Sequence, residues 1–432
     1  MVRRNSSPVF ILAGGAGERL RPLTDARPKP AVPFAGTHQL IDFTLSNCIN
    51  SGFRQIFVLT QHLREPLHDY IRRSHSRILA PAWGRGGDGL RLVPPVSGKR
   101  YRGTADAVFQ NLPLIRGDSA ENVLIASADH VYSMDYGPLL ARHATSGADL
   151  TVLAIRWPAE EATAFGVLDV EDDGTVSAFR EKPALESLPR QGEVLVSMGV
   201  YVFDRKALLD VADRATPMET DFGREILPRL IRARRVAAYD FGNADTNYWR
   251  DVGSLDSYYR ANMEVVGPRP VFDPDRGCCW PTREGCETSI DRIDRTGNSR
   301  ISKAASIEPC TIRRSVVSRD TYVERGAIIE DSVILPGARV GKNARVRNSI
   351  VTESALIPEN ARIGFNSIED HRRYRVTPSG VIVVSRPSSL YATGGQSSRV
   401  EAVPQPGSGA QESQVETGGP MAHEFWRQVK AQ

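Results

Sequence analysis

A glycine-rich segment near the amino terminus, residues 12–20, is well suited to bind phosphate. It reads Leu-Ala-Gly-Gly-Ala-Gly-Glu-Arg-Leu and directly follows a short apolar run. Glycines at this place let backbone N–H groups approach phosphate oxygens, and Arg19 can stabilise their negative charge. The segment lacks the ending of a Walker A loop and the third glycine of a dinucleotide fingerprint. Taken alone, it is equally compatible with an ordinary tight turn.

Four further charged residues could act on phosphates together with this segment. Lys29 stands between two prolines, which fix the backbone and therefore the direction of its ammonium. Asp129 follows an apolar run, and Asp251 lies in Tyr-Trp-Arg-Asp-Val-Gly, so either carboxylate could simply form a turn or a helix cap. Lys182 precedes a proline and could be an ordinary exposed lysine. Each residue is weak evidence alone, and only the ordered set favours catalysis.

The elements that must position these residues have the pattern of an α/β sheet. From about residue 9 to 266, short β-rich runs alternate with amphipathic helical stretches. The pattern predicts helices over 43–51 and 104–115, the second with Thr104 as its N-cap. Three apolar runs without polar alternation are predicted to be strands covered on both faces: residues 9–12, 55–59 and 122–126.

After a predicted linker at 267–302 the periodicity changes, and over 303–384 apolar residues recur every six positions. This period is typical of a β-helix, whereas a helix has a period of 3.6 and a half-buried strand a period of 2. The repeats form three tracks: Val317, Val323 and Ile329; Ile328, Ile334, Val340 and Val346; and Ile357 and Ile363. Four glycines are predicted at coil corners, where positive φ is useful: Gly326, Gly337, Gly341 and Gly364.

The composition argues against several classes of protein. A net charge of +4 over 432 residues favours neither nucleic acid nor an anionic membrane as a partner. No apolar run is long enough to span a bilayer, and the start lacks the apolar region of a signal peptide, so we expect a cytoplasmic protein. Residues 385–432, rich in Ser, Gly, Gln and Pro, are predicted to be disordered.

The five cysteines do not form the pattern of a disulfide framework, because they are few and odd in number. Three of them cluster inside the predicted linker, in a stretch of ten residues: Cys278, Cys279 and Cys286. A zinc site needs a fourth ligand, and no histidine nearby supplies one. We therefore favour free thiols over a metal site.

Taken in order, the motifs resemble the sugar-1-phosphate nucleotidyltransferases, and most closely the bacterial ADP-glucose pyrophosphorylases. The resemblance extends to about Val384 and rests on residues 12–20, 27–33, 41–52, 101–108, 128–132, 164–167, 181–183, 197–203 and 248–253. It implies a Rossmann-like catalytic domain over 1–266 and a left-handed β-helix over 303–384. It also implies the reaction of ATP with α-D-glucose 1-phosphate to give ADP-glucose and pyrophosphate, which supplies glycogen synthesis.

The resemblance implies roles for individual residues. Arg19 and Lys29 would cover the triphosphate, while Asp129 and Asp251 would hold Mg²⁺, a cation that prefers oxygen ligands. Lys182 would bind the sugar phosphate. The nucleotide site would be lined by Leu12, Ala13, Gly14, Gly15, Gly17, Gly103 and Thr104. The glucose 1-phosphate site would be lined by Tyr101, Gly166, Glu181, Lys182 and Ser197.

The base specificity is left open by one departure from the family pattern. Residues 94–100 lack the glutamines that the family carries before Tyr101, one of which is thought to read the adenine. One alternative is therefore a nucleotidyltransferase for another nucleotide or sugar phosphate. A second alternative is a catalytically silent subunit that assembles with an active paralogue.

A second departure concerns regulation and assembly. Ala26, Pro33 and Gln39 replace basic residues of the activator pocket in the enterobacterial type, and only Arg27 is kept. Because a bisphosphate needs several charge-assisted hydrogen bonds, we expect weak activation by fructose 1,6-bisphosphate. We also expect a homotetramer built in part by the β-helix, with a paralogous subunit as the alternative partner.

Overall fold

The computed structural model describes residues 6–75, 89–96, 99–116, 119–243, 248–277 and 298–386. The cysteine cluster at 278–286 and nearly all of the predicted disordered tail lie outside these ranges. Cys48 and Cys310 are free thiols. Within the described ranges, no helix is long and apolar enough to cross a membrane.

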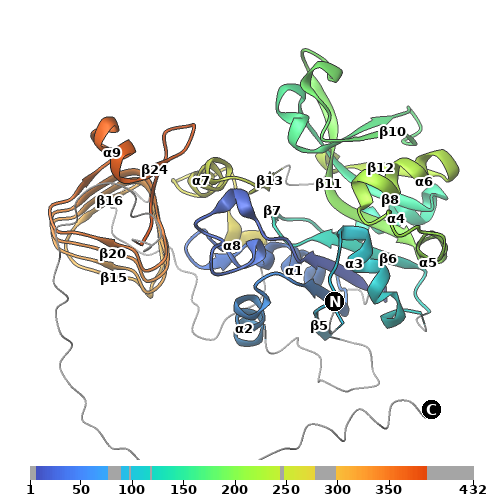
Figure 1. Cartoon of the computed structure of the whole chain (residues 1–432), viewed down its shortest axis with the longest axis horizontal. Helices are drawn as coiled ribbons and strands as arrows, with labels where there is room; N and C mark the ends of the chain where they lie inside the picture. The colour runs from blue at the N-terminus through green and yellow to red at the C-terminus, as the bar shows by residue number, and fades with distance from the viewer. Residues whose placement is uncertain are drawn as a thin grey trace, which may run out of the picture. The chain divides into compact units, whose positions relative to one another are not determined.

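In the described residues, the first part of the chain is built on a nine-stranded mixed sheet (Figure 1). Its strands are β1 (Val9–Ala13), β4 (Gln55–Thr60), β5 (Gly89–Val93), β6 (Asn122–Ser127), β8 (Leu150–Pro158), β9 (Gly166–Val170), β10 (Val176–Glu181), β11 (Glu193–Asp204) and β12 (Val236–Asp240). They lie in the order β10-β9-β11-β6-β1-β4-β5. In addition, β8 pairs with β11, and β12 pairs with β8. β1 is parallel to both β4 and β6. The strands predicted at 9–12, 55–59 and 122–126 are therefore confirmed, and the structure shows that they are neighbours.

Helices pack on both faces of this sheet, which explains the missing polar alternation. They are α1 (Ile41–Asn50), α2 (Arg64–Ser74), α3 (Thr104–Asn111), α4 (Gly137–Ser146), α5 (Arg205–Asp213) and α6 (Leu227–Ala233), the last continuing a π-helical turn η7 (Phe222–Ile226). Val9 and Ile11 pack in one hydrophobic core with residues of α1, α2 and α4. Phe10 points to the other face and packs with residues of α3, α5 and α6. Alternate side chains of β1 thus belong to different cores.

The helix predicted over 104–115 is shorter than expected, and its predicted N-cap was wrong. α3 ends at Asn111, and a 3₁₀ turn η4 (Leu112–Leu114) follows. The N-cap position is Gly103, and Thr104 is the first helical residue. The Thr104 hydroxyl donates instead to Asp221 Oδ2 at 3.0 Å and accepts the N–H of Phe222 at 3.0 Å. Its hydroxyl therefore ties α3 to η7 rather than capping its own helix.

The short strands of the first part form two small sheets of their own. Strands β2 (Pro33–Phe34) and β3 (His38–Gln39) form a small hairpin, and β7 (His130–Tyr132) pairs with β13 (Trp249–Asp251). The 3₁₀ turns are η1 (Glu18–Leu20), η2 (Lys29–Ala31), η5 (Ala159–Ala164), η6 (Leu185–Ser187) and η8 (Phe241–Asn243). Helices α7 (Leu255–Glu264) and α8 (Pro274–Gly277) follow β13.

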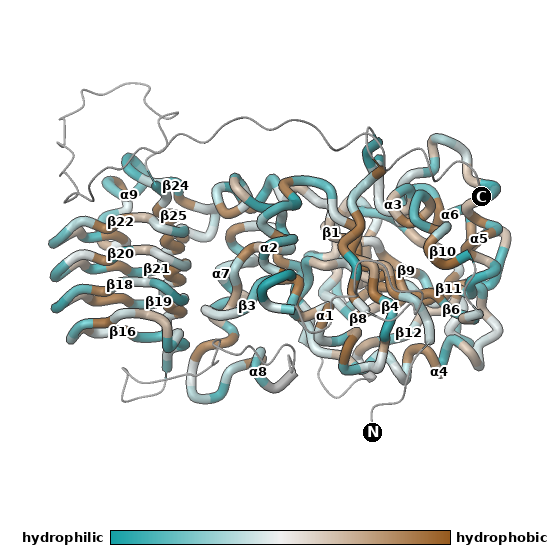
Figure 2. The backbone as a smooth tube through the Cα atoms, turned by 90° about the horizontal axis from the view of Figure 1, so that it is seen from below, coloured by the Kyte–Doolittle hydropathy of each residue, from teal (hydrophilic) through white to brown (hydrophobic). Residues whose placement is uncertain are grey.

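The second part of the chain is a β-helix of stacked strands, most of which pair in parallel (Figure 2). One sheet contains β14 (Arg300–Ile301), β16 (Thr311–Arg313), β17 (Val316–Val317), β19 (Ile328–Ile334), β21 (Arg345–Val351), β23 (Arg362–Ile363), β24 (Arg375–Val376) and β25 (Ile382–Val384). The other contains β15 (Ser306–Ile307), β18 (Tyr322–Val323), β20 (Arg339–Val340) and β22 (Leu356–Ile357). α9 (Ser367–Arg373) precedes β24. The long strands β19 and β21 turn a corner at Asp331 and Asn348, which both have positive φ.

The predicted tracks of the β-helix need one correction, because from Thr311 to Ile363 paired residues of neighbouring coils are 17 positions apart and not 18. The N–H of Ser332 donates to Ser315 Oγ in the preceding coil, 17 positions earlier. Ile328 is only half-buried and faces away from the core. The buried residues form a single track with one five-residue step per coil: Val317, Val323, Ile329, Ile334, Val340, Val346, Val351, Ile357 and Ile363.

Three of the four predicted corner glycines have positive φ: Gly326, Gly337 and Gly364. Gly341 does not, and its role is steric. A Cβ added there would lie 2.7 Å from the backbone nitrogen of Glu359 and 2.9 Å from the carbonyl oxygen of Ile357. Glycine is needed at this position because the next coil passes too close for a side chain.

Candidate active site

One ammonium and two carboxylates from distant parts of the sequence meet beyond the end of strand β6. Asp129 lies between β6 and β7, and Asp251 ends β13, which pairs with β7 so that Asp251 is opposite His130. Lys29 begins η2, with Pro28 at its N-cap. Its Nζ lies 2.9 Å from Asp129 Oδ2 and 3.0 Å from Asp251 Oδ1. The pairing of β7 with β13 therefore brings both predicted carboxylates to one ammonium.

The surroundings keep Lys29 and Asp129 charged. Burial lowers the pKa of Lys29, but the negative charges of Asp129 and Asp251 outweigh it, and the pKa is raised above its usual value. Burial opposes ionisation of Asp129 as well, yet Lys29 and His130 lower its pKa to about 2. At neutral pH the site therefore contains a buried ammonium held between two half-buried carboxylates.

His130 belongs to this cluster, although the sequence gave no role to it. Its Nδ1 donates to the carbonyl of Met198 at 3.1 Å, which directs Nε2 toward the carboxylates. Nε2 lies 3.5 Å from Asp129 Oδ1 and 3.8 Å from Asp251 Oδ1. The ring makes an edge contact with Trp249. Its place next to Asp129 in the sequence was the signal that could have identified it.

The glycine-rich segment packs directly on Lys29. Gly17 has a φ of 66°, and a Cβ added to it would lie 2.8 Å from Lys29 Cβ. The hydroxyl of Thr24 donates to the carbonyl of Gly17 at 2.9 Å and fixes the turn. Gly15 is exposed, and a Cβ added there would meet nothing within 4 Å. The backbone at Gly15 is thus accessible to a ligand, whereas Gly17 packs against Lys29.

Arg19 and the remaining residues of the predicted nucleotide site surround this turn. Arg19 is exposed, and a Cβ added to Gly253 would lie 2.9 Å from its Nη2 and 3.0 Å from Asp251 Oδ2. The guanidinium therefore faces the same glycine as the Asp251 carboxylate. Leu12 and Ala13 belong to β1, and Gly14 packs beside Gln61.

Gln61 is a second residue that the sequence did not single out. It follows β4, and its side-chain Nε2 donates to the carbonyl of Tyr101 at 3.2 Å. The N–H of Tyr101 donates in return to Gln61 Oε1 at 2.5 Å. Because Gln61 also lies beside Gly14, where an added Cβ would be 3.4 Å from Gln61 Cβ, it holds the segment around Tyr101 beside the glycine-rich turn. No local pattern around Gln61 pointed to this role.

Four of the five residues predicted to bind glucose 1-phosphate lie together on neighbouring strands. Gly166 and Glu181 are directly opposite each other in β9 and β10. Lys182 follows with a φ of 48°, its N–H donates to the carbonyl of Phe165, and its Nζ lies 3.5 Å from Glu181 Oε1. Ser197 is on β11, which pairs with β9 at the adjacent position. Lys182 is 53% exposed, so its ammonium is available to a ligand.

Tyr101, Gly103 and Thr104 have structural contacts in addition to their predicted roles. The Tyr101 hydroxyl donates to the carbonyl of Val93 at 3.2 Å and accepts from Asn111 Nδ2 at 2.9 Å. A Cβ on Gly103 would lie 2.4 Å from the carbonyl oxygen of Thr220. Glycine is therefore required at this position by close packing, independently of a ligand.

The residues present fit a magnesium ion. In the described part of the chain, no three His, Cys, Asp or Glu side chains cluster as metal ligands do. Mg²⁺ commonly uses only one or two protein carboxylates together with phosphate oxygens. Asp129 and Asp251 already share one cation, the ammonium of Lys29. Two converging carboxylates that bind a cation match this donor set.

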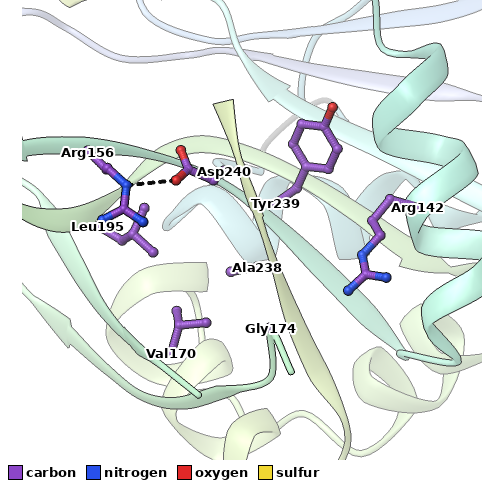
Figure 3. A pocket seen from close by; sticks show the side chains of 8 residues that line it. All are labelled: Arg142, Arg156, Val170, Gly174, Leu195, Ala238, Tyr239 and Asp240. Carbon is purple, nitrogen blue, oxygen red and sulfur yellow. Dashed lines mark hydrogen bonds and ion pairs between the residues drawn. The ribbon is translucent and has the colours of Figure 1, made fainter. Parts of the chain in front are cut away.

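A cavity of about 410 Å³ lies elsewhere on the sheet, beside the turn between β9 and β10 (Figure 3). It is bordered by Arg142, Gly174 and Tyr239, and by Arg156, whose Nε lies 3.0 Å from Asp240 Oδ2. None of the predicted site residues borders it. We therefore place the candidate site at Lys29 and not at this cavity.

Comparisons with known proteins show the family of the chain. The nucleotidyl transferase family matches residues 9–266, and the GlmU-like C-terminal hexapeptide family matches residues 286–384. The chain is 43% identical over 400 residues to glucose-1-phosphate adenylyltransferase 2 of Alkalilimnicola ehrlichii, covering 87% of this chain and 93% of that protein. It is 40% identical over 407 residues to glucose-1-phosphate adenylyltransferase of Nitrosospira multiformis, covering 89% and 94%. The chain therefore belongs to the glucose-1-phosphate adenylyltransferase family of nucleotidyl transferases.

Proposed function

We propose that the protein transfers an adenylyl group from ATP to α-D-glucose 1-phosphate. A phosphate oxygen of the sugar phosphate attacks the α-phosphorus of ATP, and the bond from that phosphorus to the oxygen bridging to the β-phosphate breaks. ADP-glucose and pyrophosphate are the products. The carrying observation is the cluster of Lys29 with Asp129 and Asp251, in a chain whose relatives bear this activity in their names.

The chemistry requires charge stabilisation and not a general base. The attacking oxygen is already ionised at neutral pH, so the obstacle is to bring two polyanions together and to release pyrophosphate. Lys29 and Arg19 supply positive charge at the glycine-rich turn, where backbone N–H groups can also donate to phosphate. Lys182 binds the phosphate of the sugar, and Glu181 accepts hydrogen bonds from its hydroxyls.

Asp129 and Asp251 are the residues that would hold Mg²⁺. When bound, the ion supplies positive charge to the phosphate oxygens and orients them. The protein's own contribution is to keep Asp129 ionised, since its pKa of about 2 leaves it a carboxylate throughout the physiological range.

The test is an activity matrix in which ATP, UTP, dTTP and GTP are each combined with glucose 1-phosphate and glucosamine 1-phosphate. Pyrophosphate release and product identity are measured for each pair. We expect the ATP and glucose 1-phosphate pair to have the highest kcat/KM. Preference for another pair would contradict the proposed specificity, and activity with none of them would favour a silent subunit.

The proposal extends to the setting of the reaction. We place the protein in the cytoplasm, as a source of ADP-glucose for glycogen synthesis. Arg27 is paired with Glu353, which supports the expectation that fructose 1,6-bisphosphate activates the protein weakly, by less than about fivefold.

We propose a homotetramer in which the β-helix contributes to the contacts between subunits. Exposed apolar side chains such as Leu356 on β22 and Ile368 on α9 support such a contact. Light scattering on the full chain measures the mass in solution, and we expect four times the mass of one chain. A monomer at micromolar concentration would contradict this proposal.

A further inference from the structure

The β-helix and the catalytic part of the chain share one hydrophobic core. Three parts of the chain contribute to this core. The segment 20–36 supplies Leu20, Leu23, Val32, Phe34 and Ala35. Helix α7 supplies Leu255, Tyr258 and Ala261, and the β-helix supplies Val316, Val333 and Ile350. In Figure 1, α7 stands between the β-helix and the strands β7 and β13. A Cβ added to Gly36 would lie 3.4 Å from the carbonyl oxygen of Val317, so the backbones approach closely. The segment that contains Lys29 is thus packed on the β-helix.

Three side chains of the β-helix region also reach this segment through polar contacts. At one end, Arg375 Nη1 donates to the carbonyl of Arg21 at 2.6 Å. At the other end, Arg300 Nε donates to the carbonyl of Ala35 at 3.3 Å. Between them, Glu353 accepts a hydrogen bond from Arg27 Nη2. The last contact is an ion pair, and it is the one nearest to Lys29 in the sequence.

The Arg27 guanidinium connects Glu353 to the turn that carries Lys29. Its Nη1 donates to the carbonyl of Ala31, the last residue of η2, at 3.4 Å. Only 20% of the Arg27 side chain and 28% of the Glu353 side chain are exposed. Burial raises the pKa of Glu353, and the charges of Arg27 and Arg319 oppose this rise. The pair is half-buried, so removing either charge would leave the other partly desolvated without its partner.

We propose that Glu353 is a positioning residue for the transfer reaction. Through Arg27 it fixes the η2 turn, so that the Lys29 ammonium stays between Asp129 and Asp251 and is presented to the triphosphate. Glu353 touches no substrate in this role. The catalytic part of the proposal rests on the function proposed above, whereas the fixing of residues 21–36 does not.

The first experiment replaces Glu353 by Gln, which keeps its size and removes its charge. We expect kcat to fall at least about tenfold with the KM for glucose 1-phosphate within about twofold, since small misplacements of a reacting group are costly. Glu353→Asp should recover part of this loss. The matched control is Glu330→Gln, which removes a carboxylate 3.2 Å from Arg313 on the surface of the same β-helix and should leave kcat unchanged.

A double-mutant cycle tests whether Glu353 acts through Arg27. If it does, the variant Arg27→Gln/Glu353→Gln should have the same kcat as Arg27→Gln alone, because the second change removes nothing further. Additive losses in the double variant would show that Glu353 acts by another route and would overturn the proposal.

Hydrogen exchange provides a readout that does not depend on activity. We expect Glu353→Gln to speed exchange in peptides covering residues 21–36 and to leave the strands β19 and β21 unchanged, whereas Glu330→Gln should alter neither. Such a change would support the positioning role even if the wild type preferred another substrate pair, with kcat then measured on that pair. Unchanged exchange at 21–36 would overturn the proposal, and so would faster exchange throughout the β-helix, which indicates a general loss of stability.

Discussion

At the scale of single residues, the site consists of opposite charges that form ion pairs with one another in the absence of a phosphate ligand. The Lys29 ammonium is buried and would be costly without partners, and Asp129 and Asp251 supply them at 2.9 Å and 3.0 Å. A triphosphate with its metal ion offers both kinds of partner at once. The same contacts that stabilise the folded site therefore prepare it for its ligand.

The first prediction concerns Asp129→Asn. Turnover should fall by at least about 10³-fold, because one of the two carboxylates for the metal loses its charge. The fold should be retained, since Asp251 still pairs with Lys29. Initial rates with saturating substrates and a thermal melt measure the two effects. Asp169→Asn is the control, because Asp169 is exposed and pairs only with Arg180 among the described contacts. A variant with kcat within a few-fold of wild type would refute the assignment.

The second prediction concerns Lys182→Gln, which removes an exposed ammonium beside Glu181. We expect the KM for glucose 1-phosphate to rise by at least about tenfold while the KM for ATP changes little, because the contact is made in ground and transition states alike. Steady-state kinetics with each substrate varied in turn measure this. Equal changes in both KM values, or a change in kcat alone, would assign Lys182 to a different role.

At the scale of elements, the coils of the β-helix are spaced by backbone contact, and at Gly341 the next coil passes too close for a side chain. We expect Gly341→Ala to destabilise the protein by about 2–3 kcal/mol, because the new Cβ would meet the backbone of the next coil at 2.7–2.9 Å.

Gly380→Ala is the matched control for this third prediction. Gly380 has a φ of 85° with nothing within 4 Å of an added Cβ, so only the backbone conformation is strained and the cost should be about 1 kcal/mol. The midpoint of urea unfolding ranks the two variants. A smaller loss for Gly341→Ala than for Gly380→Ala would show that the coils adjust easily.

At the scale of the whole molecule, the buried histidines predict how stability depends on pH. Burial lowers the pKa of His68, His75 and His143 below the usual value. The unfolded chain then binds more protons than the folded one as the pH falls below the unfolded value of about 6.5. The stability from these neutral histidines is therefore present above that pH and is lost on acidification.

The fourth prediction is a lower urea midpoint at pH 5.5 than at pH 7.5, at constant ionic strength. His143→Gln should weaken this dependence, because it removes one titrating group while an amide can still bond to Thr151. A midpoint that stays constant or rises on acidification would contradict the prediction. A separate loss of stability is expected below about pH 4. Asp129 and Asp275 each have a pKa of about 2 in the folded protein, so on acidification they become protonated in the unfolded chain first.

The sequence alone determined the kinds of elements and the family of the chain. Strands β1, β4 and β6 were identified because burial on both faces leaves apolar runs that are visible locally. The β-helix was identified because its six-residue period is repeated over many coils. The period hid the single five-residue step in each coil, and Ile328 was therefore wrongly predicted to face the core. The candidate residues were found as an ordered set of motifs.

Tertiary structure decided which of these residues meet. Lys29 and Asp251 are 222 positions apart, and only the pairing of β7 with β13 brings them together. The contacts of Gln61 with Tyr101 and of Arg27 with Glu353 left no trace in the sequence, because no local periodicity reports a contact between distant segments. Such contacts depend on the register of strands and the packing of a shared core, which the whole chain determines at once.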